Sequence, residues 1–378
     1  MRMTAAVMYE QGLPLPYATS RPFRIEEVEL EGPGDGEVLV EVRGAGMCHS
    51  DLSTVAGMRK RPLPVVGGHE GAGIVREVGK GVKTLRPGDH VVMSNFASCG
   101  HCRLCNEGRN ILCESVTDAR VKGLLSNGER RLSLGGKPVN HYSGVSCFAQ
   151  YAVAMPDTLI RVDDRVPLDI AALFGCAVVT GAGAVFNSAR VRPGQYVAVI
   201  GLGGVGLNAV MAARVAGAAE IIGIDINENK FALARELGCT NTFLGNDPEI
   251  ARKVQALTEG GVHYTFEVSG AKPAMTTAYA ITSKGGEIIC VGLGATNDMY
   301  QYPHAQLVAS EKVIRGSLMG SGNAQRDIPR YVRMYLDGKL PVDKLKSGTM
   351  GFDGLNLSMD RLEHGDVVRQ ILLPHGGL

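Results

Sequence analysis

The chain has 378 residues, and its 39 Lys and Arg nearly balance 38 Asp and Glu, which leaves a net charge of +1. This balance gives no strong field toward nucleic acid or an anionic membrane, so we expect no partner of either kind. The length predicts two domains, and hydrophobic residues at 45% supply enough apolar surface for sizeable cores.

No stretch of the sequence is long and uncharged enough for a membrane span, and the apolar run before Glu10 is too short for a secretory leader. The nine cysteines are odd in number and clustered, which favours metal binding over a disulfide framework. We therefore expect a cytoplasmic protein that stays in a reducing compartment.

Up to about residue 175 the segments are short, β-rich and interrupted by Gly and Pro. Alternation of apolar and polar residues predicts strands at 37–42 and 73–78, and a Pro-Gly-Asp turn leads into a strand at 90–93.

After residue 180, continuous apolar runs alternate with helical patterns. Strands are predicted at 196–200, 221–224, 240–244, 264–267 and 287–291, and helices at 205–216, 228–237, 248–259 and 273–281. This alternation is typical of a parallel doubly wound sheet in an α/β domain. The chain then returns through a helix at 328–336 and rejoins the first domain in irregular and β segments.

Four cysteines lie within fifteen residues in the pattern Cys-x2-Cys-x2-Cys-x7-Cys: Cys99, Cys102, Cys105 and Cys113. Four thiolates this close fit one tetrahedral zinc and leave no ligand position for a substrate. The pattern therefore predicts a structural zinc site. A zinc ribbon that binds nucleic acid would normally show two separated Cys-x2-Cys pairs.

A glycine-rich turn follows the strand predicted at 196–200, and its fingerprint residues are Gly201, Gly203, Gly204, Val205 and Gly206. A helix follows this turn, and the next predicted strand ends at Asp225, which is the arrangement of a dinucleotide-binding unit. Glycines let the backbone approach a pyrophosphate, which the helix N-terminus attracts. Asp225 would accept hydrogen bonds from a ribose and repel a 2′-phosphate, so we expect NAD; a purely structural role for Asp225 is the alternative.

A second set of possible metal ligands occurs in three separate segments, which contain Cys48, His69 with Glu70, and Cys176. Each residue alone has an ordinary explanation, since single buried cysteines usually only pack against their neighbours. Spacing does not join segments this far apart, so the residues by themselves are only candidate ligands.

Three features together resemble a known family over nearly the whole chain. They are the segment Gly68-His69-Glu70-x2-Gly73 with Gly79, the four-cysteine motif and the fingerprint that ends at Asp225. The family is the zinc-dependent alcohol dehydrogenases of the medium-chain dehydrogenase/reductase superfamily, in its long form. The resemblance implies a β-rich GroES-like catalytic domain over 1–177 and 318–378, with a Rossmann NAD-binding domain over 178–317.

The resemblance also implies a role for individual residues. Cys48, His69 and Cys176 would bind a catalytic zinc and leave its fourth position for water or alcohol, with Glu70 behind the metal and Asp51 orienting His69. Ser50 would be the first hydroxyl of the proton relay. The residues implied to contact the cofactor are His49 and Arg369 at the pyrophosphate, Lys230 near the adenosine ribose and Thr180 at the nicotinamide.

The chain departs from the family at several positions. Ser53 stands where several members end the proton relay with a histidine, which predicts a steeper dependence of rate on pH. The branch that oxidises the glutathione adduct of formaldehyde uses an arginine where this chain has Thr117, although Arg120 is three residues on. That branch has acidic residues where this loop reads Arg59-Lys60-Arg61, which is either a solvated surface or a gate for an anionic substrate.

The implied activity is oxidation of a primary aliphatic or aromatic alcohol with NAD, or reduction of the aldehyde, with two zinc ions per subunit. Alternatives are the glutathione-dependent formaldehyde reaction and a non-catalytic relative that binds nucleotide. Asn95 and Tyr142 fall where the family lines its substrate pocket. We expect a homodimer or homotetramer, with 313–318 as a candidate edge strand.

Overall fold

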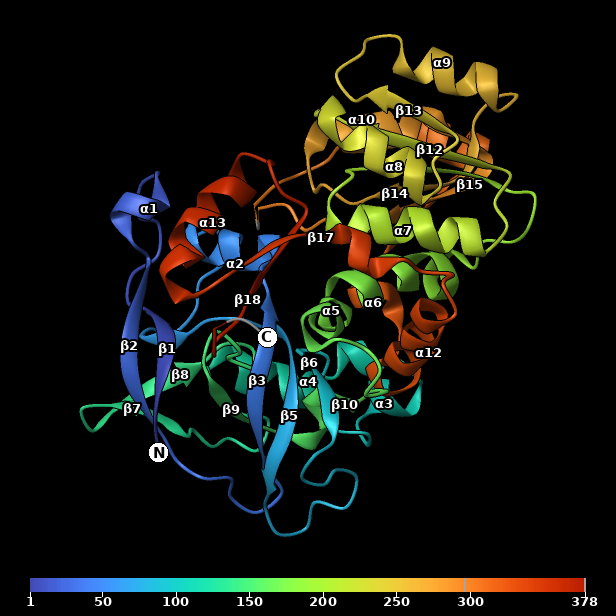
Figure 1. Cartoon of the computed structure of the whole chain (residues 1–378). Helices are drawn as coiled ribbons and strands as arrows, with labels where there is room; N and C mark the ends of the chain where they lie inside the picture. The colour runs from blue at the N-terminus through green and yellow to red at the C-terminus, as the bar shows by residue number, and fades with distance from the viewer. Residues whose placement is uncertain (296, 377–378) are drawn as a thin grey trace. The chain divides into compact units, whose positions relative to one another are not determined.

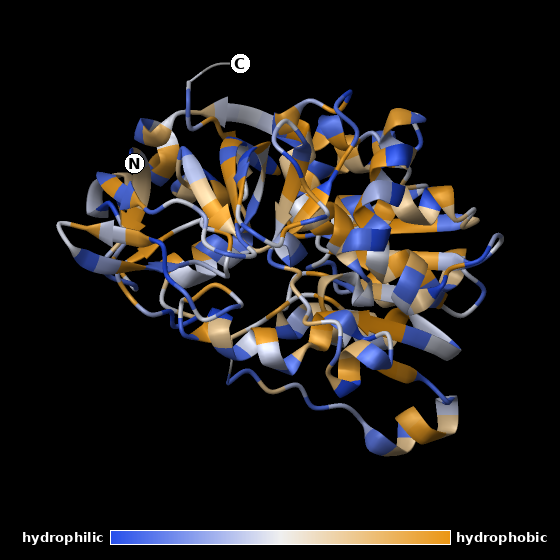
Figure 2. Ribbon diagram, turned by 90° about the horizontal axis from the view of Figure 1, so that it is seen from below, coloured by the Kyte–Doolittle hydropathy of each residue, from blue (hydrophilic) through white to orange (hydrophobic). Residues whose placement is uncertain are grey.

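The computed structural model describes residues 1–295 and 297–376, and the chain divides into two compact units. Unit 1 consists of Met1–Cys176, Asn323–Leu336 and Val342–Leu378, and unit 2 consists of Ala177–Gly322 and Asp337–Pro341. Figure 1 shows the path of the chain through both units, and Figure 2 shows hydrophobic and hydrophilic residues alternating in bands along the helices.

Unit 1 is built on two β-structures. One is a closed barrel in the order β1-β2-β7-β8-β4, and the other is a sheet in the order β10-β6-β5-β3-β18-β17, with β9 paired to β3. The strands are β1 (Arg2–Met8), β2 (Phe23–Leu30), β3 (Val38–Gly46), β4 (Val65–Val66), β5 (Glu70–Val78), β6 (His90–Ser94), β7 (Leu132–Leu134), β8 (Lys137–His141), β9 (Tyr151–Ala154), β10 (Leu159–Arg161), β17 (Lys346–Met350) and β18 (Arg369–Leu372).

Helices in unit 1 are short, except near the C-terminus. They are α1 (Tyr17–Ser20), α2 (His49–Val55), α3 (Arg103–Asn106), α4 (Glu114–Val121), α5 (Leu168–Ala171), α12 (Ala324–Leu336) and α13 (Leu355–Glu363), and the 3₁₀ turns are Asn110–Leu112, Pro156–Thr158, Ala172–Gly175, Val342–Leu345 and Phe352–Gly354.

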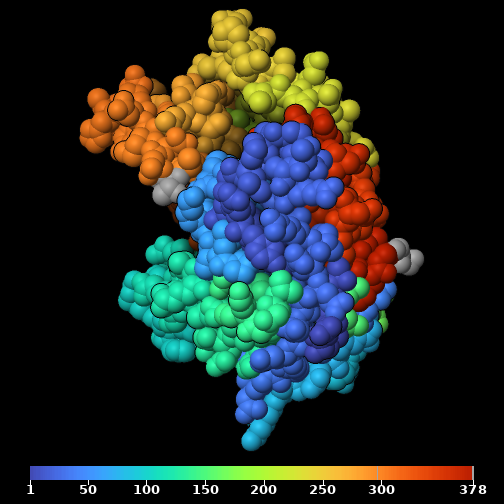
Figure 3. All heavy atoms as spheres, turned by 90° about the vertical axis from the view of Figure 1, so that its left-hand side faces the viewer, coloured from blue at the N-terminus to red at the C-terminus, as the bar shows by residue number. Residues whose placement is uncertain are grey.

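The C-terminal segment completes unit 1, as the sequence predicted. Strand β18 pairs antiparallel with β3, and β17 pairs parallel with β18. The Asp360 carboxylate in α13 accepts hydrogen bonds from the backbone N–H groups of Tyr17 and Ala18 at 2.6 and 2.8 Å. Figure 3 shows the red C-terminal atoms lying against the blue N-terminal ones.

Helix α13 itself was not expected, because the tail was predicted to contain only irregular and β segments. Its buried residues Leu355, Met359 and Leu362 follow the i, i+4, i+7 spacing of an amphipathic helix. The helical segment has only nine residues and is flanked by Gly354 and Gly365, so its periodicity is hard to recognise in the sequence.

Unit 2 contains a six-stranded sheet in the order β13-β12-β11-β14-β15-β16, and every strand pairing in it is parallel. Its strands are β11 (Tyr196–Ile200), β12 (Glu220–Asp225), β13 (Asn241–Leu244), β14 (Val262–Glu267), β15 (Thr282–Cys290) and β16 (Val313–Gly316). Its helices are α6 (Ala177–Gly183), a π-helical turn Ala184–Ala189, α7 (Gly204–Val215), the 3₁₀ turn Glu228–Lys230, α8 (Phe231–Leu237), α9 (Ile250–Leu257), α10 (Lys272–Ile281), α11 (His304–Ser310) and the 3₁₀ turn Met319–Ser321.

Both faces of this sheet are buried, as expected of a doubly wound fold. Ala198 and Ile200 of β11 belong to a core with Ile250 and Val254 of α9, whereas Val199 points to the α7 side, where a Cβ at Gly206 would touch it. Strands with two buried faces read as continuous apolar runs, which is why the sequence revealed them.

Among the described residues, no single helix is long and apolar enough to cross a membrane. One bent pair, Leu168–Gly175 with Ala177–Ala189, meets that test by length and composition only.

Candidate active site

Four buried side chains from three distant segments of unit 1 meet in one cluster: Cys48, His69, Glu70 and Cys176. Their ligand atoms all lie within 4.8 Å of one another. Cys48 is the N-cap of α2, His69 and Glu70 mark the start of β5, and Cys176 follows the turn Ala172–Gly175. The fold therefore brings together the residues that sequence spacing alone could not join.

Two glycines make room for this cluster. Gly68 has φ +90, and a Cβ there would lie 2.7 Å from Cys147 Sγ and from the Phe148 backbone nitrogen. A Cβ at Gly46 would lie 2.5 Å from Glu70 Oε1. A side chain at Gly46 would therefore displace Glu70, and one at Gly68 would displace Cys147 or Phe148.

The donor set fits a zinc ion. Cys48 Sγ and Cys176 Sγ are 3.9 Å apart. Two sulfurs about 2.3 Å from one tetrahedral zinc lie about 3.8 Å apart, so this spacing needs no adjustment. His69 Nδ1 bonds to Asp51 Oδ1 at 3.0 Å, and its buried Nε2 has no hydrogen-bond partner. That nitrogen is the remaining ligand atom of the imidazole.

Asp51 contacts two of the candidate zinc ligands, His69 and Cys48. Its Oδ1 faces His69 Nδ1, and its Oδ2 accepts a hydrogen bond from the Cys48 backbone N–H at 3.0 Å. Burial alone would lower the pKa of His69, but Asp51 outweighs burial and raises that pKa well above its ordinary value. A metal at Nε2 must therefore displace a proton, so its affinity falls as the pH falls.

The two thiols are not equivalent. The hydrogen bond from Cys176, followed by the charges of Arg369 and His69, lowers the pKa of Cys48 well below its usual value. The same bond and burial raise the pKa of Cys176. The lowered pKa of Cys48 favours its thiolate, which is the form of cysteine that binds a metal cation.

Glu70 and Arg369 form a fully buried pair behind the thiols. Arg369 Nη1 is 3.6 Å from Glu70 Oε2 and donates to the Met47 carbonyl at 3.0 Å. Burial raises the pKa of Glu70 to about 8, against the opposing charge of Arg369. The sequence did not indicate Glu70 as a partner of Arg369, and the expected contact of Arg369 with the cofactor pyrophosphate stays a prediction.

The hydroxyl groups near the cluster have defined partners. Arg59 Nη1 donates to Ser50 Oγ at 3.3 Å. Ser53 Oγ donates to the His49 carbonyl at 2.8 Å inside α2, so its proton is committed to the backbone. Tyr142, which the sequence placed only at the pocket wall, packs edge-to-face on His69 with ring centroids 5.7 Å apart. His49 is exposed at the first position of α2.

The four-cysteine motif also closes into a cluster. Cys99 and Cys105 have Sγ atoms 4.0 Å apart, and Cys102 and Cys113 have Sγ atoms 3.9 Å apart, which is again the spacing of a tetrahedral zinc site. Backbone N–H bonds lower the pKa of Cys99 to about 6, whereas burial raises that of Cys105 to about 12. These thiols would fill every position of a metal ion and leave none for substrate.

The glycine-rich turn in unit 2 has the geometry of a phosphate-binding loop. Gly201 has φ +100, and a Cβ on Gly206 would lie 1.8 Å from the Gly201 carbonyl oxygen, so the helix and turn can pack this closely only with glycine. Helix α7 begins at Gly204 with Gly203 as N-cap, and Val205 lies in its first turn.

Asp225 ends β12 beside this turn. Its Oδ2 accepts from the Leu202 N–H at 2.7 Å and its Oδ1 from the Asn227 N–H at 2.9 Å, while Lys230 Nζ lies 3.2 Å from Oδ2. The carboxylate thus orders the loop, and its unused lone pairs can still accept a ribose hydroxyl. Thr180 lies in α6, where its hydroxyl contacts Met319 Sδ at 3.5 Å.

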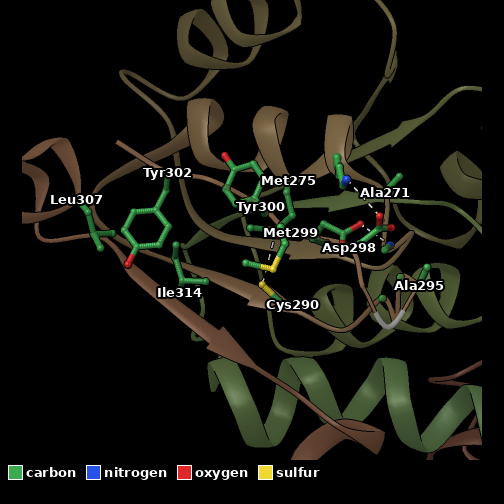
Figure 4. Close-up of a pocket in the computed structure, with 15 residues that line it drawn as sticks. Ala271, Met275, Cys290, Ala295, Asp298, Met299, Tyr300, Tyr302, Leu307 and Ile314 are labelled. Carbon is green, nitrogen blue, oxygen red and sulfur yellow. Dashed lines mark hydrogen bonds and ion pairs between the residues drawn. The ribbon is translucent and has the colours of Figure 1, made fainter. Parts of the chain in front are cut away.

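A cavity of about 510 Å³ lies beyond the carboxyl ends of β14 and β15 in unit 2. Figure 4 shows Tyr302, Leu307 and Ile314 at one end and Asp298 at the other. Lys272 pairs with Asp298 at 3.2 Å, and none of the candidate zinc ligands lines this cavity. It therefore carries no chemistry of the thiol cluster.

Comparison with known proteins identifies the family. The model of the alcohol dehydrogenase GroES-like domain matches residues 34–164, and that of the zinc-binding dehydrogenase matches residues 204–337. The chain is 36% identical to an S-(hydroxymethyl)glutathione dehydrogenase of Paracoccus denitrificans, over 99% of this chain and 100% of the relative.

Solved structures agree. A benzyl alcohol dehydrogenase of Acinetobacter calcoaceticus is 32% identical with a TM-score of 0.92, over 99% of both chains. An alcohol dehydrogenase zinc-binding domain protein of Burkholderia ambifaria is 35% identical with a TM-score of 0.93, over 99% of this chain and 100% of the other. The chain belongs to the zinc-dependent alcohol dehydrogenases of the medium-chain dehydrogenase/reductase superfamily.

Proposed function

We propose that unit 1 is the catalytic zinc domain and unit 2 the NAD-binding domain of an enzyme that oxidises a primary aliphatic or aromatic alcohol and reduces the corresponding aldehyde. The observation that carries the proposal is the buried set of two thiols and one imidazole whose Nε2 has no protein partner. Three such ligands leave one position open, which is the pattern of a catalytic rather than a structural zinc.

In this proposal Cys48, His69 and Cys176 hold the catalytic zinc, and the four-cysteine cluster holds the structural one. Zinc would supply a Lewis acid for the alcohol oxygen, and NAD would supply the acceptor for the hydride. Asp51 fixes the imidazole tautomer and orientation. The buried Glu70–Arg369 pair lies behind the thiols, where the positive charge of Arg369 favours the thiolate form of Cys48.

The alcohol loses a hydride and a proton when its carbon–oxygen bond becomes a carbonyl. Ser50 Oγ is the hydroxyl that can receive the proton, and Arg59 already donates a hydrogen bond to it. Because Arg59 cannot accept a proton, the proton must leave along another path. Ser53 is not a titratable group and donates its proton to the His49 carbonyl, so it cannot pass the proton on. We therefore propose that water accepts the proton at the end of this path.

For the cofactor we propose NAD rather than NADP. Asp225 is buried beside the glycine-rich turn, and its only nearby cation, among the described residues, is Lys230 at 3.2 Å. That lysine is already paired with the carboxylate and is not free to neutralise a 2′-phosphate, which would therefore lie against the negative charge of Asp225. His49 and Thr180 are proposed contacts of the pyrophosphate and the nicotinamide.

A second candidate is oxidation of the glutathione adduct of formaldehyde, which the name of the 36%-identical relative favours. We further propose a homodimer or homotetramer formed through β16 and the residues just after it, since Val313 in β16 and Leu318 beyond its end are exposed. All nine cysteines are free thiols, which supports a reducing, cytoplasmic location.

Metal analysis tests the ligand assignment without relying on activity. The purified chain is expected to hold two zinc ions. Cys176→Ser should lose one of them and the dehydrogenase activity, whereas Cys105→Ser should lose the other and chiefly lower thermal stability. Two retained zinc ions in Cys176→Ser would contradict the assignment.

A further inference from the structure

The candidate zinc ligands come from three segments, and Asp51 links only two of them. Its two hydrogen bonds reach His69 and the Cys48 backbone, so this carboxylate joins α2 to the start of β5. Cys176 belongs to the third segment and receives neither bond. Zinc ligands must lie within about 0.2 Å of their usual distances from the metal. The position of Cys176 therefore needs a support of its own.

The backbone at Cys176 is irregular. This residue stands between the turn Ala172–Gly175 and helix α6, and its φ of −142 lies outside the helical range. The residue before it is Gly175, where a Cβ would collide with the carbonyl oxygen of Met93. Close packing thus requires glycine, the residue with the greatest backbone freedom, directly before a candidate ligand.

One buried hydroxyl restrains this flexible position. Ser94 Oγ donates a hydrogen bond to the Gly175 carbonyl at 2.6 Å, and Ser94 has no exposed surface. The Gly175 carbonyl and the backbone nitrogen and Cα of Cys176 belong to one planar peptide group. A bond that fixes the carbonyl oxygen therefore fixes the orientation of the plane from which the Cys176 side chain projects.

A second hydrogen bond directs the proton of Ser94 to this carbonyl. The Phe96 N–H donates to Ser94 Oγ at 3.3 Å, and this contact is also buried. A serine hydroxyl has a single proton, which is left for Gly175 when its oxygen accepts from Phe96. Without the hydroxyl, a buried N–H and a buried C=O would both lose a partner, which is costly away from water.

Ser94 itself lies on a rigid part of unit 1. It is the last residue of β6, a strand that pairs antiparallel with β5 and also with β10. Ser94 is the direct partner of Glu70 in the pairing with β5, and Glu70 follows His69 in the chain. The hydroxyl therefore ties the Cys176 turn to the same strand start that carries the imidazole.

We propose that Ser94 is a positioning residue of the catalytic zinc site, because its hydroxyl holds the Gly175–Cys176 peptide where the Cys176 thiolate can bind the metal. This inference rests on the proposed function and adds a residue that is not itself a ligand. Asp51 joins the other two ligands to each other, and Ser94 joins Cys176 to β5. Sequence patterns do not indicate this contact, since the two bonded residues are 81 positions apart.

Zinc affinity tests this role without turnover. Ser94→Ala removes the hydroxyl and should weaken zinc binding in the catalytic site about 5- to 20-fold. Zinc in the four-cysteine site should keep its affinity. Ser188→Ala is the matched control, since that buried serine makes a 2.8 Å hydroxyl–hydroxyl bond to Ser317 in unit 2. The control should lower thermal stability and leave both zinc affinities within about twofold of the parent.

Two further measurements separate positioning from general stability. Ser94→Thr keeps the hydroxyl and should retain catalytic-site zinc affinity within about threefold of the parent. The d–d absorption bands of the cobalt(II)-substituted protein depend on coordination geometry, so Ser94→Ala should shift them and Ser188→Ala should not. At saturating zinc, Ser94→Ala should lower kcat severalfold and leave the KM for NAD unchanged, because the glycine-rich turn lies in unit 2.

Three results would overturn the inference and leave the proposed function intact. The first is an unchanged catalytic-site affinity and cobalt spectrum in Ser94→Ala. The second is an equal loss of affinity in Ser94→Ala and Ser94→Thr, which would assign the effect to packing instead of the hydroxyl. The third is an equal loss in Ser188→Ala, which would show only general destabilisation. If the parent binds zinc in the four-cysteine site alone, the proposed function itself fails.

Discussion

Asp51 should control how tightly the catalytic zinc is held, although it is not itself a proposed ligand. It is 2% exposed and accepts two hydrogen bonds at 3.0 Å, from His69 Nδ1 and from the Cys48 backbone N–H. Both donors belong to proposed zinc ligands. Replacing Asp51 with Asn leaves one acceptor oxygen and turns an NH₂ group toward the other donor.

The size of the effect follows from those two bonds. A hydrogen bond to a charged group contributes about 1.5–3 kcal/mol. Asp51→Asn removes one of the two hydrogen bonds completely and leaves the other without a charged acceptor. We therefore expect zinc to bind about 10- to 100-fold more weakly in the catalytic site, the usual range for a lost partner of a ligating histidine. Zinc in the four-cysteine site should be unaffected.

The assay is competition for zinc with a coloured chelator near neutral pH, which resolves the two sites by their different affinities. Asp163→Asn is the matched control, because that carboxylate pairs with Arg165 on the surface and belongs to neither cysteine cluster. The control should retain parental affinity at both sites. A catalytic-site affinity within twofold of the parent in Asp51→Asn would refute the role assigned to Asp51.

Three further predictions address the cofactor, the proton path and stability. Asp225→Ser should reduce the preference for NAD over NADP by about tenfold or more, since the repulsion of a 2′-phosphate is removed; an unchanged ratio of kcat/KM would leave Asp225 with a structural role only. Ser53→His should raise the low-pH rate of alcohol oxidation severalfold and flatten the pH profile, because the serine proton is committed to the backbone; an unchanged low-pH rate would contradict this path. Burial alone would raise the pKa of Glu37, but hydrogen bonds from Arg131, Asn127 and the Gly34 N–H outweigh burial and lower that pKa. The carboxylate therefore stabilises the fold above the unfolded pKa of 4.5, and this stabilisation is lost as the pH falls through the lower pKa of the folded state. Glu37→Gln should therefore cost about 2–4 kcal/mol near neutral pH, by denaturant unfolding, and less below pH of about 4; a pH-independent cost would refute the linkage.

Much of unit 2 could be predicted from the sequence because its strands are buried on both faces. The run at 196–200 coincides with β11, and the glycine-rich turn with its following helix occurs where the pattern placed it. Local constraints, a tight turn and a helix start, determine such motifs. Such motifs can be recognised from neighbouring residues in the sequence alone.

The four-cysteine cluster was also predictable, since its ligands are close in sequence. The second cluster was not, because Cys48, His69 and Cys176 come from three segments, and only the resemblance joined them. The fold supplies the reason: β3, β5 and the turn before Cys176 converge in unit 1.

Contacts of long side chains were the least predictable features. The pairing of Arg369 with Glu70 and the position of Arg61 over Tyr142 link residues far apart in the chain. No periodicity in the sequence predicts these two contacts. The sequence left the basic loop at 59–61 as either a solvated surface or a gate for an anionic substrate, and the choice between them stays a prediction.

The central claim is that this chain is an NAD-dependent zinc alcohol dehydrogenase with its catalytic metal at Cys48, His69 and Cys176. NADH formation by the zinc-loaded protein tests it most directly, with NAD and a panel of short aliphatic, benzylic and carboxylate-bearing primary alcohols, and with formaldehyde in the presence and absence of glutathione. The account predicts turnover of alcohols without glutathione that a strong zinc chelator abolishes. Absence of turnover on every substrate, with two zinc ions and NAD bound, would contradict it.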